Sequence, residues 1–188
     1  NILKTLGYTL VLVQFTETVR RSLQQNSDIF SRLLAFLNDN KHIPFPGAKE
    51  EGFVIMGISQ GGVIGRYGAY LYDSHRKPSD APIRLFSSLD SPHQGAVMPM
   101  GLFSTVAFWS KQGASSAEMF KDMLQAKGAE DLLVYDNQCI SSLCYSKINV
   151  NSGFLFDDYR KAAEYKGFPS VLIAQGQLKG VSPVHKND

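Results

Sequence analysis

The sequence is poor in several features that mark particular protein classes. Its 188 residues include only two cysteines and one tryptophan, and no apolar run approaches the ~18 residues that a membrane span needs. Two cysteines are too few for a disulfide-dense miniature protein. The sequence also has no internal repeat and no low-complexity segment, which excludes repeat and disordered classes. Because 19 basic residues face 17 acidic ones, the net charge is only +2, without a block of like charges. Nothing therefore favours nucleic acid or anionic lipid as the partner.

The composition is that of an ordinary globular domain. Hydrophobic residues make up 44% and charged residues 19% of the chain, and a domain of this length buries about 70% of the surface that its unfolded chain exposes. The chain begins at Asn1 rather than at a methionine and has no charged-then-apolar leader, so we expect it to be cut or processed. The missing leader says nothing about export, and the compartment stays open.

The two cysteines, Cys139 and Cys144, lie in a serine-rich stretch with four residues between them. A small local disulfide in an exported protein is one interpretation, and two free thiols are the other. A structural zinc ion is not expected, because zinc takes four protein ligands and no histidine is near the pair.

Apolar runs and helical spacings alternate along the chain. Strands are expected at residues 8–15, 52–57, 83–89 and 170–174, where β-branched and apolar residues cluster. Helices are expected from the capping residues Asn26, Ser27 and Asp28 to a point before Pro44, and then at 63–73, 98–135 and 156–165. The segment Tyr8–Phe15 is almost continuously apolar, which predicts a strand that is covered on both faces.

This order of elements predicts an α/β fold with a mostly parallel, doubly wound sheet and right-handed crossovers. The helical stretch after the third strand interrupts the alternation. We expect residues 98–147 to form a helical cap or lid inserted at the carboxyl edge of the sheet, where ligands bind. Phe103 and Phe108 would then line an acyl pocket, or they would simply form the packed face of two helices.

One pentapeptide, Gly57-Ile58-Ser59-Gln60-Gly61, matches the pattern G-x-S-x-G between an expected strand and an expected helix. In that context the pattern predicts a turn so tight that the serine is strained and its hydroxyl stands clear of the sheet, with small residues at Gly57 and Gly61 preventing collisions. Ser59 is then the candidate nucleophile, and the N–H of Gln60 is the candidate donor to an oxyanion.

This turn has two other interpretations. One is a glycine-rich connection between strand and helix that carries an unreactive serine. The other is a phosphate-binding P-loop, which does not fit because no Lys-Ser/Thr pair follows the glycines.

From Gly7 to about Leu133, roughly two-thirds of the chain, the sequence resembles an α/β-hydrolase of the bacterial lipase/esterase-like branch. The motifs that carry the resemblance are Gly57-Ile-Ser-Gln-Gly-Gly62, Arg66-Tyr67 and Leu89-Asp-Ser-Pro-His-Gln-Gly-Ala96. Palmitoyl-thioesterases show a similar pair, a Ser-Gln-Gly-Gly turn and a His-Gln-Gly. The resemblance implies a serine hydrolase that requires neither a metal nor an organic cofactor.

The resemblance also implies parts that this sequence does not supply. Several strands normally precede the strand that ends at the nucleophile, whereas only Tyr8–Phe15 precedes it here. The triad follows the chain order Ser, then Asp or Glu, then His after the last strand, and this sequence stops one strand early. Residues 1–188 are therefore expected to form part of a larger hydrolase domain.

Asp90 is the candidate for the triad acid. It follows the strand after the nucleophile helix, in a Leu-Asp-Ser-Pro setting that resembles the acid position of some lipases. The alternative is that Asp90 only caps the following loop. Among the histidines, His42 and His75 are expected in surface loops, His93 is expected to structure its loop, and His185 comes early for the catalytic position. We therefore expect the catalytic histidine outside this sequence.

These observations predict a serine hydrolase that cleaves carboxylic esters through an acyl-enzyme on Ser59, acting on a small-molecule acyl ester or a lipid. An acyl-thioesterase, an acyltransferase and a non-catalytic binding module on the same fold stay open as alternatives. A patatin-like Ser–Asp hydrolase ranks lower, because its Asp-Gly-Gly/Ala motif does not occur in the sequence. The isolated 188-residue chain is expected to show little or no turnover.

Overall fold

The computed structural model describes residues 5, 7–15, 21–40, 52–97, 99–124, 126–133, 135–140, 143–148 and 158–174, and gives the strands at 135–140 and 143–148 by their backbone alone. Within these ranges the chain has the predicted α/β character. Its elements are, in order, α2 (Leu23–Asp39), β1 (Phe53–Ile58), α3 (Gln60–His75), β2 (Ile83–Leu89), α4 (Met100–Lys111), α5 (Ser115–Leu124), α6 (Lys127–Leu132), β3 (Tyr135–Ile140), β4 (Leu143–Ile148), α7 (Tyr159–Glu164) and β5 (Ser170–Ile173).

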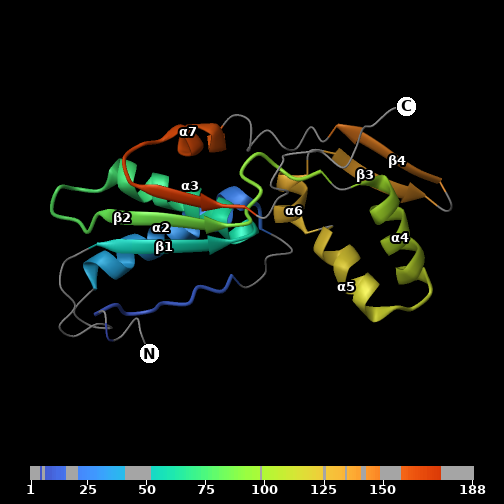
Figure 1. Cartoon of the computed structure of the whole chain (residues 1–188), viewed down its shortest axis with the longest axis horizontal. Coiled ribbons are helices and arrows are strands. Elements are labelled where there is room, and N and C mark those ends of the chain that lie inside the picture. Colours follow the sequence, from blue (N-terminus) through green and yellow to red (C-terminus); the bar gives the residue numbers. More distant parts are fainter. Residues whose placement is uncertain are drawn as a thin grey trace.

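Three strands form a parallel sheet in the order β1-β2-β5 (Figure 1). Ile58 at the end of β1 pairs with Leu89 at the end of β2, and Leu89 pairs in turn with Ile173 at the end of β5. All three strands therefore finish at one edge. In Figure 1 the arrowheads of the three strands point toward α6.

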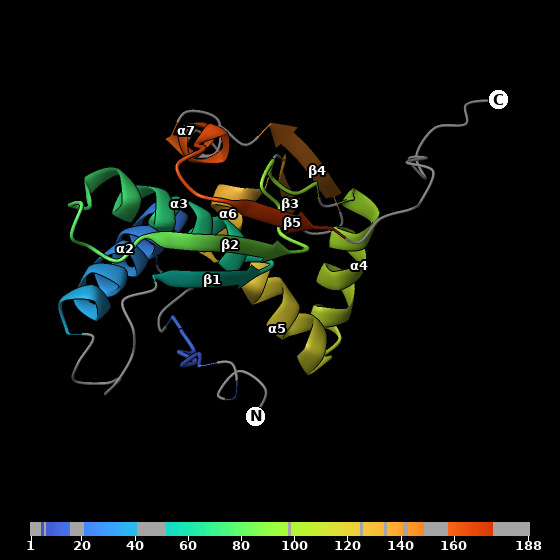
Figure 2. The ribbon, with the colours of Figure 1, turned by 60° about the vertical axis from the view of Figure 1, so that its left-hand side comes forward.

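The apolar core lies between α3 and the sheet and between α3 and α2 (Figure 2). Two glycines of α3 allow this close packing. A Cβ on Gly68 would lie 2.8 Å from the carbonyl oxygen of Ser27 in α2, and one on Gly65 would lie 3.4 Å from the ring of Phe86 in β2. The other face of β1 carries Val54, Met56 and Ile58, which are exposed. Double winding, with helices on both faces, stays a prediction.

The start of α2 differs from the prediction. The helix begins at Leu23, so the capping residues expected at Asn26 and Ser27 lie inside it, and both are buried. The N-cap is Ser22, whose side chain accepts from the N–H of Gln25, while the side chain of Gln25 accepts from the N–H of Ser22. This reciprocal capping box satisfies two N–H groups at once, so it is a stronger start signal than a single capping residue.

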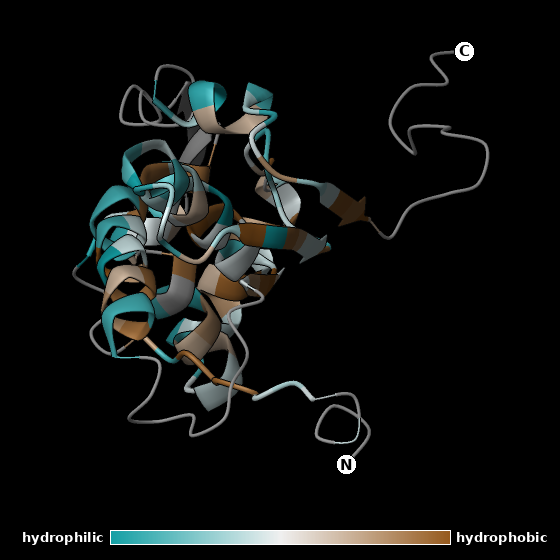
Figure 3. Cartoon of the chain, turned by 90° about the vertical axis from the view of Figure 1, so that its left-hand side faces the viewer, coloured by the Kyte–Doolittle hydropathy of each residue, from teal (hydrophilic) through white to brown (hydrophobic). Residues whose placement is uncertain are grey.

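The prediction for Tyr8–Phe15 was wrong. The described segment runs extended but pairs with no described strand, and Leu12 is 85% exposed. Figure 3 shows most of it in the brown of hydrophobic residues. Only Phe15, at its end, packs against the core cluster that includes Leu23 and Val63. An apolar run favours an extended backbone, but a strand also needs a neighbouring edge for its N–H and C=O groups.

The remaining elements follow the expected order. The segment 98–147, predicted to be a helical cap, contains α4, α5 and α6, but from Tyr135 onward the chain forms the antiparallel hairpin β3–β4. The hairpin places Cys139 directly opposite Cys144. The side chains of both cysteines lie outside the described residues, so disulfide and free thiols both stay open. Whether the segment acts as a lid also stays a prediction. No helix among the described residues combines the length and apolarity of a membrane span.

Candidate active site at the carboxyl edge of the sheet

Ser59 is the single residue between β1 and α3. Its backbone has φ 52° and ψ −130°, a conformation that glycine adopts easily and other residues adopt at a cost of about 1–3 kcal/mol. Its N–H donates to the carbonyl oxygen of Leu89 at 3.0 Å, and its side chain makes no helix-capping hydrogen bond. Ser59 is exposed. The predicted strained turn with an outward serine is therefore present.

Two glycines make room for this turn. A Cβ on Gly57 would lie 2.4 Å from the Cα of Gly62, and one on Gly62 would lie 2.0 Å from Oγ of Ser91. Gly61, in contrast, has nothing within 4 Å of its Cβ position. The prediction that Gly57 prevents collisions is confirmed, but the one for Gly61 was wrong. The close neighbour of the strand is Gly62, one residue further into the helix.

The start of α3 faces the same point. The first N–H groups of a helix have no carbonyl partner within the helix, and the peptide dipoles of the 16 residues add to a partial positive charge there. The first N–H belongs to Gln60, which directly follows Ser59. A negative oxygen that develops beside Ser59 would thus meet an N–H donor and a favourable field.

Asp90 lies next to this turn. It follows Leu89 just as Ser59 follows Ile58, and Leu89 and Ile58 are paired across the two strands. Asp90 is exposed, has φ 47°, and donates its N–H to the carbonyl oxygen of Ile173 at 2.7 Å. The only two non-glycine residues with positive φ in the described chain are therefore Ser59 and Asp90. The structure brings these two site candidates together at one edge.

His93 follows Asp90 closely, but both of its ring nitrogens are engaged. Nε2 lies 2.7 Å from Oγ of Ser88, and Nδ1 contacts the hydroxyl of Tyr159, whose ring stacks on the imidazole at 6.0 Å. A neutral imidazole satisfies this arrangement, because one nitrogen donates and the other accepts. Burial, together with the nearby charge of Arg66, lowers the pKa of His93. His93 thus ties its loop to β2 and α7 through side-chain contacts, whereas the expected loop-structuring role is a hydrogen bond to the backbone.

The other histidines supply no base beside Ser59 within the described chain. His75 is exposed and is the last residue of α3. The whole 16-residue helix, which rises about 1.5 Å per residue, separates it from Ser59. Its Nδ1 meets the carbonyl oxygen of Leu71 and the hydroxyl of Ser74. His42 and His185 lie outside the described residues.

Arg66, one of the residues on which the sequence resemblance rests, holds parts of the fold together. It is only 6% exposed and donates to the carbonyl oxygens of Ala162 at 2.9 Å and Tyr165 at 2.6 Å. Its guanidinium also lies over the rings of Phe86 and Phe168. Arg66 thus ties α7 and the approach to β5 onto α3.

The chain matches no protein-family model, no curated protein and no solved structure. The assignment of a function to this edge therefore depends on its own geometry. Among the described residues, no group of three or more His, Cys, Asp or Glu side chains could hold a metal ion.

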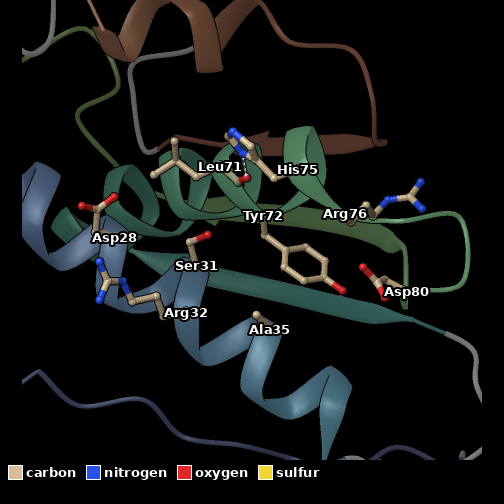
Figure 4. Close-up of a pocket in the computed structure, with 9 residues that line it drawn as sticks. All are labelled: Asp28, Ser31, Arg32, Ala35, Leu71, Tyr72, His75, Arg76 and Asp80. Carbon is tan, nitrogen blue, oxygen red and sulfur yellow. Dashed lines mark hydrogen bonds between the residues drawn. The ribbon is translucent and has the colours of Figure 1, made fainter.

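Two surface hollows lie away from Ser59. One, of about 310 Å³, lies between α2 and α3 and the loop after α3 (Figure 4). Some of its polar groups are used by the protein itself, since the hydroxyl of Tyr72 donates to the carbonyl oxygen of Ala81 and Arg76 pairs with Asp73. The other, of about 540 Å³, is lined by Arg66 and residues 163–170. Neither is lined by a predicted site residue.

Two residues of α6 pack near the start of α2 and the start of α3, and no sequence pattern indicated this. Asp131, only 4% exposed, accepts from the N–H of Leu23 at 2.8 Å, and Gly128 is buried against the side chain of Gln60. A short stretch that mixes Lys, Glu and Asp is typical of a solvated helix face. Only the folded chain shows that this stretch reaches Gln60, beside the strained turn at Ser59.

Proposed function

We propose that this protein is a serine hydrolase of α/β-hydrolase type, cleaving carboxylic esters through an acyl-enzyme on Ser59. The observation that carries the proposal is the backbone of Ser59, an exposed non-glycine residue with φ 52° between a parallel strand and the first N–H of a long helix. A protein maintains such strain where the surrounding structure enforces it, and strained residues of this kind cluster at active sites.

The chemistry has two stages. In the first, Oγ of Ser59 attacks the ester carbonyl while a histidine accepts the serine proton. The carbonyl oxygen becomes negative and receives a hydrogen bond from the N–H of Gln60. When the intermediate collapses, the histidine returns the proton to the alcohol that leaves. In the second stage, water attacks the acyl-serine with the same histidine as base, which releases the carboxylic acid and restores Ser59.

The base is assigned to a histidine outside the described residues, because His93 is occupied by Ser88 and Tyr159. Asp90 is assigned the role of orienting that imidazole and stabilising its protonated form. Its position at the end of the strand next to β1 supports this role. The segment 98–147 would contribute the substrate pocket, and an acyl-thioester or an acyl acceptor other than water would use the same geometry.

The test uses the protein that carries this chain and compares the parent with Ser59→Ala. Both are treated with a fluorophosphonate probe, which labels a reactive serine, and the rate of labelling is measured. We expect labelling of the parent and a loss of about 10³-fold or more in the variant, because the nucleophile is gone. Ser91→Ala is the matched control, since this serine follows Asp90 at the same edge. Labelling that Ser59→Ala leaves unchanged would mean that another residue reacts and would overturn the proposal for Ser59. A parent that shows no labelling would instead support a non-catalytic binding module.

A further inference from the structure

The side chain of Gln60 lies against α6. A Cβ on Gly128 would lie 2.1 Å from Nε2 of Gln60 and 3.4 Å from its Cδ. Position 128 therefore has to be free of a side chain for the amide of Gln60 to lie where it does. Gly128 is buried and Gln60 is half-buried, so this contact lies inside the fold at the start of α3.

Helix α6 is itself fixed on two sides. The buried carboxylate of Asp131 accepts the N–H of Leu23 at 2.8 Å, which joins α6 to the start of α2, and Lys127 lies 3.4 Å from the other oxygen. On the second side, the N–H of Ala96 donates to the carbonyl oxygen of Leu132 at 2.7 Å. Ala96 belongs to the loop that follows Asp90, so α6 is attached both to the start of α2 and to the loop beside the candidate site.

Helix α4 shows the contrast within the same segment. None of its residues is buried, and Phe108 and Trp109 are each more than half exposed. The part of the segment that carries α6 is therefore anchored, whereas α4 lies on the outside.

We propose that α6 is a fixed wall of the acylation site and that Gly128 is a positioning residue, acting through the side chain of Gln60. This inference rests on the proposed function. The first residue of a helix is prone to fraying, because its N–H has no partner within the helix. Packing of the Gln60 amide on Gly128 restrains that residue, so its N–H keeps the direction that an oxyanion requires. A lid movement would leave α6 in place and involve only α4 and α5.

The test replaces Gly128 by alanine, with Gly101→Ala as the matched control. Both glycines lie in helices of the same segment, but Gly101 has nothing within 4 Å of its Cβ position. In Gly128→Ala we expect an unchanged or higher Tm, because the displaced atom ends a flexible side chain and alanine favours a helix. We expect about tenfold slower phosphonylation of Ser59, since small displacements at a reacting centre are costly. Backbone hydrogen exchange at residues 60 and 61 should become faster.

A second variant separates positioning from general damage. Gln60→Ala removes the side chain that Gly128 accommodates, so Gly128→Ala should have no further effect in that background. In ester hydrolysis, Gly128→Ala should lower kcat and leave KM unchanged. Unchanged exchange and labelling in Gly128→Ala, or effects that add fully to those of Gln60→Ala, would overturn the inference. If exchange becomes faster but the parent shows no Ser59 labelling, the packing inference stands and the hydrolase proposal fails.

Discussion

Two serines at the carboxyl edge of the sheet have opposite environments. Ser59 is exposed and strained and makes no helix-capping hydrogen bond. Ser88 is 1% exposed, lies within β2, and is bonded to His93, which is held in turn by Tyr159. Buried polar groups are normally satisfied in this way because an unpaired one is costly. Strain is concentrated at the exposed serine and hydrogen bonding at the buried one, which distinguishes a candidate for chemistry from a structural group.

The largest loss of stability is expected when a side chain is added at Gly57, where the backbone of the Ser59 turn leaves no space. In Gly57→Ala the new Cβ meets backbone atoms of Gly61 and Gly62, which cannot move without shifting α3. We expect a loss of about 3 kcal/mol in the free energy of unfolding, measured with urea, together with a loss of Ser59 labelling. The matched variant Gly61→Ala has open space at the same position and should stay within about 1 kcal/mol of the parent. Equal effects of the two variants would show that the turn is not tight.

The next effect concerns the buried cluster. His93→Ala leaves the hydroxyls of Ser88 and Tyr159 without their shared partner, so we expect a loss of about 2 kcal/mol in thermal or urea unfolding. Labelling of Ser59 in the folded fraction should be retained, because the proposed base is a histidine other than His93, whose two ring nitrogens already have partners. If a stably folded His93→Ala variant is no longer labelled at Ser59, then the cluster of Ser88 and His93 is not purely structural, and His93 takes part in the chemistry.

The pH dependence of the free energy of unfolding is a second test of the structural role of His93. Burial and Arg66 lower the pKa of His93 in the folded protein below the ordinary value of 6.5, so the unfolded chain binds the proton more readily. The contribution of His93 to stability is thus complete above pH 6.5 and is lost as the pH falls through the lowered folded pKa. Urea unfolding as a function of pH should show this loss in the parent, and His93→Ala should lack that part.

The smallest effect is expected from relieving the strain at Ser59. Glycine adopts the backbone conformation of Ser59 without a steric cost, but it loses more entropy on folding. Ser59→Gly should therefore raise the free energy of unfolding by about 1 kcal/mol while it removes labelling. A clear destabilisation by Ser59→Gly would mean that the serine side chain supports the fold, as Ser88 does.

Much of this edge could be predicted because its parts are local. The apolar runs gave β2 at 83–89 and β5 close to 170–174, and the G-x-S-x-G pattern gave the position and the strain of Ser59. The placement of Asp90 beside it followed from the alternation of strands and helices, since parallel strands finish at one edge.

The sequence alone therefore determined β1, β2, β5, the helix that follows Ser59 and the strained turn at Ser59, because helix hydrogen bonds and the conformational preferences of glycine act over a few residues. The tertiary structure decided that Tyr8–Phe15 has no strand partner among the described residues, that Gly62 rather than Gly61 meets the strand, and that Gly128 meets Gln60. It also decided that Asp131 binds the N–H of Leu23, 108 residues away along the chain. Such contacts join distant segments, and no local pattern records which distant atoms will share one small volume.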